Sequence, residues 1–126
     1  MDHPIVEKIM KDGINSVNIS MLSEDAQKRI LGDVGEKLFK QGKFQEAVDI
    51  MVKAGEFDKL IKLGDSFLKE RKSDLAMICF LPTKDKDRLN DAAVLCIQAK
   101  NYALAAKAYE AADNSQMASF IKENFC

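Results

Sequence analysis

The feature that most constrains the fold of this chain is a recurrence of similar residues every 29 residues. Ala47, Ala76 and Ala105 are separated by this step. A period between 20 and 50 residues is typical of arrays in which one supersecondary unit is repeated. Four more sets follow the same step, with small residues replacing small ones and large apolar residues replacing large ones: Gly35, Gly64 and Ala93; Leu31, Leu60, Leu89 and Ala118; Leu38, Phe67 and Cys96; and Met51, Phe80 and Tyr109.

Each period contains two stretches of helical spacing. In the first period, Leu31, Val34 and Leu38 lie three and four residues apart, Gly42 interrupts the pattern, and helical spacing resumes at Phe44. A helix hairpin is therefore expected in each period. Small residues at the Gly35 and Ala47 positions would let the two helices of a hairpin approach closely, and the large residues would fill the space around the crossing.

The second hairpin carries its own boundary signals. We expect its second helix to start at Ser73 and Asp74, with the serine as a helix N-cap. The helix is expected to end at Leu81, because Pro82 has no N–H to continue the hydrogen-bond ladder.

The sequence predicts an all-α fold, an α-solenoid of about three helix-hairpin repeats. One hairpin cannot bury its apolar face alone, so stacked hairpins share a continuous core. Ahead of the repeats, a short helix is expected from Pro4 to Asp12, while Ile14 to Leu22 fits both an alternating and a helical pattern. The expected organisation is an N-terminal helical extension at 1–22 and a repeat domain at 23–126, with units at about 28–55, 57–83 and 86–112 and a capping helix at 114–124.

Composition narrows the function classes. The chain has 126 residues with 19 Lys and Arg against 20 Asp and Glu. This balance argues against a dominant attraction to nucleic acid or to an anionic membrane. No apolar run is long enough to cross a bilayer, and residues 1–12 lack a signal-peptide pattern. An odd number of cysteines (Cys79, Cys96 and Cys126) favours a reducing compartment, so a cytoplasmic location is expected.

No residue pattern indicates catalysis, a cofactor or a metal. The only histidine, His3, is expected to be a solvated side chain, and the cysteines have no histidine partner at a useful spacing. The basic stretch 69–72 is interleaved with acids and is expected to be a solvated turn rather than a nucleic-acid site. A terminal apolar stripe either covers the end of the core or docks another subunit; it contains Met117, Phe120, Ile121 and Phe125.

The first and third periods resemble the tetratricopeptide repeat, whose first helix carries L-G-x-x-Y and whose second carries small, aromatic and small residues. The 29-residue step is shorter than that family's usual repeat of about 34 residues. Short, drifting repeats and the stretch at 41–65 are also similar to the helical arms of intraflagellar-transport and coatomer subunits. The residues that carry the likeness are Gly35, Leu38, Gly42, Phe44, Ala47, Met51 and Ala54, and then Ala93, Cys96, Lys100, Tyr102, Ala105, Tyr109 and Ala112; the second period matches at Gly64, Phe67, Ala76 and Phe80 and departs at Arg71, Ser73 and Thr83.

This resemblance implies a groove lined by the first helix of each hairpin. Phe39, Leu68 and Ile97 would form an apolar strip along it, unless neighbouring helices already cover them. The chain lacks the Lys and Asn pattern of the family's carboxylate clamps. The implied partner-binding residues are Arg29, Asp33, Glu36 and Phe39 in the first unit, Lys62, Asp65 and Leu68 in the second, and Asn90, Val94 and Ile97 in the third.

We therefore expect a non-catalytic adaptor that binds an apolar peptide or helix of another protein. The alternative is a structural subunit of a larger assembly, such as a trafficking or coat-like complex, which docks through its terminal helices. Neither nucleic-acid binding nor membrane insertion is expected.

Overall fold

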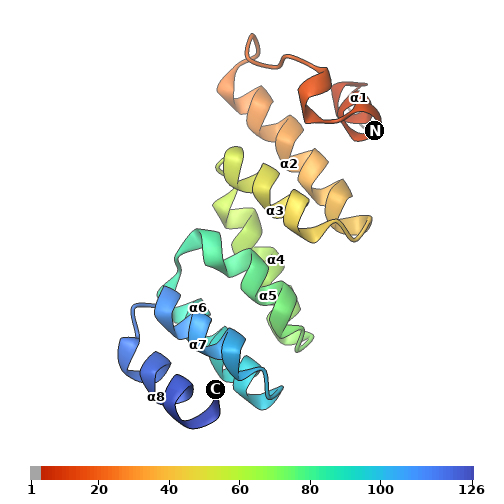
Figure 1. Cartoon of the computed structure of the whole chain (residues 1–126). Helices are drawn as coiled ribbons and strands as arrows, with labels where there is room; N and C mark the ends of the chain where they lie inside the picture. Colours follow the sequence, from red (N-terminus) through yellow and green to blue (C-terminus); the bar gives the residue numbers. More distant parts are fainter. Residues whose placement is uncertain (1–3) are drawn as a thin grey trace. The chain divides into compact units, whose positions relative to one another are not determined.

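A computed structural model describes residues 4–126, so the expectation for His3 concerns a residue outside the described part. All regular structure in these 123 residues is helical, as the sequence predicts at the level of fold class. Residues 4–126 contain eight α-helices, labelled in Figure 1, and two short 3-10 helices: α1 (Pro4–Asp12), η1 (Ile14–Ser16), α2 (Glu24–Lys40), α3 (Phe44–Lys53), α4 (Phe57–Lys69), α5 (Ser73–Phe80), η2 (Leu81–Thr83), α6 (Lys86–Gln98), α7 (Tyr102–Ala111) and α8 (Ser115–Phe125).

The chain forms two compact units. The first extends to Phe57 and contains α1, α2 and α3. The second is Asp58–Cys126 and contains nearly all of α4 and the helices α5 to α8.

The same tight turn joins α2 to α3, α4 to α5, and α6 to α7. The left-handed residue of the turn is Gly42 (φ 79°), Arg71 (φ 62°) or Lys100 (φ 62°). In each turn the next residue donates its backbone N–H over 2.9 Å to a carbonyl in the last turn of the preceding helix, as Lys43 does to Leu38. These bonds satisfy carbonyls that the helix end would leave unpaired. The turns follow one another at the 29-residue step seen in the sequence.

A second left-handed position follows each pair, at Gly55 (φ 73°), Lys84 (φ 56°) and Asp113 (φ 59°). The middle connection differs from the other two because it contains Pro82. The helix α5 ends at Phe80, one residue before the predicted Leu81, and the chain continues as the 3-10 helix η2.

Ser73 is not the N-cap that the sequence predicts. Lys72 occupies the N-cap position without a side-chain cap hydrogen bond, and Ser73 is the first helical residue. The side chain of Ser73 is buried and hydrogen-bonds to Cys96, so it contributes to packing between elements rather than to a cap. The prediction failed because a serine near a helix start serves either purpose.

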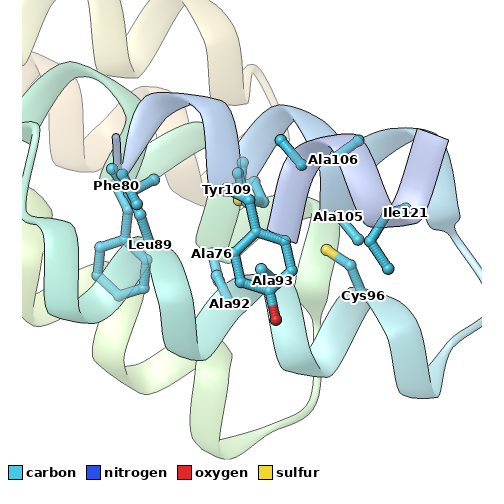
Figure 2. Packing of buried hydrophobic residues seen from close by; sticks show 14 residues of the cluster. Ala76, Phe80, Leu89, Ala92, Ala93, Cys96, Ala105, Ala106, Tyr109 and Ile121 are labelled. Atoms are coloured by element: carbon cyan, nitrogen blue, oxygen red, sulfur yellow. The ribbon is translucent and has the colours of Figure 1, made fainter. Parts of the chain in front are cut away.

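Small residues face large ones across each hairpin. A Cβ atom added to Gly35 would lie 2.7 Å from Cγ of Met51, and one added to Gly64 would lie 2.7 Å from Cδ1 of Phe80. The large residue follows the small one by 16 positions in both cases, and Tyr109 follows Ala93 by the same interval. In Figure 2 the Tyr109 side chain lies by Ala92 and Ala93 in the core of the second unit.

In the first unit, α1 packs on α2. Val6 and Ile9 of α1 are buried in one cluster with Ile30, Val34 and Leu38 of α2. After η1 the chain has no regular structure until α2, so neither the strand-like nor the helical pattern of Ile14 to Leu22 extends over the segment. Ser23 is the N-cap of α2, because its side chain accepts a hydrogen bond from the N–H of Ala26.

The second unit has one core to which all of its α-helices contribute. Phe80, Leu89 and Cys96 are fully buried there. From α8, Ala118 and Ile121 enter the same cluster. The last helix therefore covers part of the core, as one of the two interpretations of the terminal stripe requires.

Candidate partner-binding surfaces

Two polar contacts hold α4 and α6 together in the second unit. The guanidinium of Arg88, near the start of α6, donates to both carboxylate oxygens of Asp65 in α4, at 2.7 and 3.0 Å. Arg71, just after α4, donates to the side chain of Gln98 at the end of α6 over 2.7 Å. Because the two contacts occur in the same order along both helices, α4 and α6 lie side by side and run in the same direction.

The second helices of these two pairs are joined in a similar way. Asn101, the N-cap of α7, accepts a hydrogen bond from the N–H of Leu104 and donates its amide to Asp74 in the first turn of α5 over 3.4 Å. The starts of α5 and α7 are therefore neighbours. Asn114 caps α8 and donates to the side chain of Asn90 in α6 over 3.3 Å. Within Asp58–Cys126, the pair α4–α5 is thus stacked against the pair α6–α7, and α8 follows.

The charges around Arg88 form a local network. Asp85 accepts a hydrogen bond from the backbone N–H of Arg88 and forms an ion pair with its guanidinium at 2.9 Å. The backbone hydrogen bond is the main reason that the pKa of Asp85 lies below its ordinary value of 3.8. The side-chain bonds to Asp65 and Asp85 raise the pKa of Arg88, which stays charged.

The structure brings the six partner-binding residues predicted in this unit onto the neighbouring helices α4 and α6. Lys62 is exposed, and Val94 is 47% exposed. Leu68 and Ile97 are half-buried and pack against the core, so part of their apolar surface is already covered. Asp65 and Asn90 are held by Arg88 and Asn114 respectively.

The four predicted residues of the first unit lie on α2. Arg29 and Glu36 are exposed, and Asp33 is half-buried. Phe39 is half-buried, packs against the core of this unit, and contacts the ring of Phe44 with 5.9 Å between ring centroids. As with Leu68 and Ile97, packing against the core covers part of the Phe39 side chain.

An aromatic surface lies where α7 meets α8. The rings of Tyr102 and Phe125 are stacked, with centroids 4.6 Å apart, and Phe120 approaches Phe125 edge-on at 6.2 Å. Phe120 is 51% exposed and Phe125 is 48% exposed. The terminal stripe of the sequence is therefore divided: Ile121 packs inward, and the two phenylalanines remain accessible from solvent.

The thiols in the described residues differ in accessibility. Cys79 is fully buried, and burial raises its pKa to about 12. Cys96 is also buried, which raises its pKa, while Cys126 is exposed. No group of three or more His, Cys, Asp or Glu side chains within residues 4–126 is placed to hold a metal ion. Of the helices described, none combines the length and the apolar character needed to cross a membrane.

Sequence reasoning missed two contributors to these surfaces. Arg88 carries no sequence signal for this role, since its separation of 23 positions from Asp65 matches no short-range pairing rule. The sequence relates Tyr102 only to the repeat pattern, although its ring stacks on that of Phe125. Neither contact has a local signal, because both depend on how consecutive helix pairs stack.

Comparisons with protein-family models, with curated proteins and with solved structures found no match for this chain.

Proposed function

We propose that this chain is a non-catalytic, cytoplasmic protein-interaction module built from tetratricopeptide-like helix pairs, and that it binds an apolar peptide or helix of a partner protein. Support comes from the two left-handed turn positions, each of which recurs at the 29-residue step. The parallel stacking of α4 on α6 further supports a solenoid of repeated hairpins. Buried Cys79 and Cys96 make poor nucleophiles because their pKa values are raised.

One observation carries the proposed binding mode: Val94 is an exposed apolar residue on α6, beside a second helix that runs parallel to it. In this proposal the partner contacts Val94 and the uncovered parts of Leu68 and Ile97, while Lys62 contributes a charge at the edge. Asp65 then acts by holding Arg88 rather than by touching the partner. On α2, the predicted residues Arg29, Asp33, Glu36 and Phe39 would form a binding surface of the first unit by itself.

Site-specific photo-crosslinking in cells that express the whole chain tests this mode. A photoreactive amino acid replaces Val94 in one variant and exposed Ala103 of α7 in the control. We expect a discrete adduct from position 94 that is absent from position 103, and we expect the adduct to disappear when Lys62→Glu is added. Equal adducts from both positions, or none from position 94, would contradict binding at α4 and α6.

The aromatic surface supports a second candidate, a structural subunit of a trafficking or coat-like assembly that docks through α8. Phe120 and Phe125 expose about half of their surface, and large exposed aromatic residues are enriched at protein interfaces. The same experiment distinguishes the candidates. Docking through α8 predicts adducts from a photoreactive residue at position 120 and not from one at exposed Lys122, which lies on the opposite side of the same helix.

A further inference from the structure

The first unit contains a cavity of about 420 Å³ between α1 and α3, with α2 as its floor. Met10 of α1, Ile14 of η1 and Ile50 of α3 are half-buried and line the cavity, so its wall is largely apolar. Its volume lies within the range of about 300–1,000 Å³ that is usual for ligand-binding pockets. All of its lining residues belong to this unit, so the cavity is independent of the surface on α4 and α6.

The edge of the cavity is acidic on the α3 side. Glu46 and Asp49 are exposed there and lie three residues apart, which places both carboxylates on one face of the helix. Gln45 donates to one carboxylate oxygen of Asp49 over 2.9 Å and orients the group. The only cation among the lining residues is Lys43, one turn before Glu46.

The other two helix pairs have no acid at the position of Glu46. The residues equivalent to Glu46 are Leu75 in α5 and Leu104 in α7. Both leucines are half-buried, and Leu104 packs against the core of the second unit. In α5 and α7 this position is apolar, whereas in α3 it carries a charge. The α3 face is therefore suited to a ligand that combines an apolar group with a cation.

We propose that this cavity binds a short peptide segment of a partner protein, which inserts one large apolar side chain between Met10, Ile14 and Ile50 and places a Lys or Arg side chain against Glu46 and Asp49. Burial of the apolar side chain in the cavity removes it from water, which favours binding. The carboxylates at the edge favour a positive charge beside it. Lys43 repels a base at the start of α3, which fixes the direction of the bound segment.

Selection from a library of short random peptides displayed on phage, with the whole chain as bait, tests this proposal. We expect the enriched peptides to combine a large apolar residue with a neighbouring Lys or Arg. In NMR spectra, the selected peptide should shift the backbone amide signals of the residues lining the cavity. No enrichment, enrichment of acidic peptides, or shifts confined to the second unit would each overturn the proposal.

Two variants and a matched control sharpen the test. Glu46→Lys should weaken binding of the selected peptide by about fivefold or more through lost and reversed charge. Glu123→Lys makes the same charge change on α8, where the side chain is exposed, and should leave binding unchanged. Ile14→Trp should fill the cavity and block binding. Undiminished binding to both cavity variants, each shown to be folded by its melting curve, would overturn the proposal.

Discussion

Replacing Lys100 by glycine should stabilise the second unit. Lys100 adopts a left-handed backbone conformation with φ 62°, at the place where the first hairpin has Gly42. This conformation costs an L-residue about 1–2 kcal/mol. Glycine avoids that cost but loses more backbone entropy on folding, about 0.5–1 kcal/mol. The difference is a gain of about 0.5–1 kcal/mol in the free energy of unfolding, or a rise of about 3 °C in Tm.

Urea denaturation followed by far-UV circular dichroism measures this effect. Lys107→Gly is the matched control, because the same substitution at an exposed site inside α7 should destabilise by about 0.7 kcal/mol. Arg71→Gly should gain less than Lys100→Gly, since it also removes the hydrogen bond to Gln98. Gly42→Lys should destabilise by about 1 kcal/mol. If Lys100→Gly destabilised the protein as much as Lys107→Gly, the assigned role of the left-handed turn would be refuted.

Three further predictions follow from the packing and charges. Gly64→Ala should lower the free energy of unfolding by about 1 kcal/mol, because the cost of overpacking against the rigid ring of Phe80 exceeds the gain in helix propensity. A higher free energy of unfolding, measured by urea denaturation, would contradict this prediction. A thiol reagent at mildly alkaline pH should label Cys126 in the native protein and Cys79 only after unfolding, since the pKa of Cys79 is raised to about 12; rapid native labelling of Cys79 would refute its burial. The pKa of Asp85 is lowered in the folded state, so its stabilising effect is present above about pH 4 and is lost as the pH falls through the folded pKa; Asp85→Asn should therefore show a smaller loss of stability on acidification than the wild type.

The helices were predictable because their signals are local. Gly42 and Gly55 mark turns by their residue type, and the spacing of Leu31, Val34 and Leu38 defines an apolar helix face. The left-handed conformations of Arg71 and Lys100 could not be predicted from residue type. Neither residue favours a left-handed conformation, and only the 29-residue step relates them to Gly42.

The surfaces were less predictable than the helices. The 29-residue register predicts that Lys62, Leu68, Val94 and Ile97 lie on the first helix of a hairpin. It does not predict how much of each side chain is covered by the core. Burial depends on the distance and rotation between packed helices, which single-residue patterns do not encode. The cavity beside Ile14 is a sharper case, since it arises from the way α1 leaves part of α3 uncovered.

The two contacts between α4 and α6 also bear on the rate at which a partner could bind. Sliding one helix along the other would break both the Arg88–Asp65 pair and the Arg71–Gln98 hydrogen bond. A partner would therefore meet a surface that is already ordered, without waiting for a slow rearrangement. Association should then proceed in one kinetic phase at the ordinary protein–protein rate of about 10⁵–10⁷ M⁻¹s⁻¹. Differences in affinity among partners would arise mainly from how long each complex lasts.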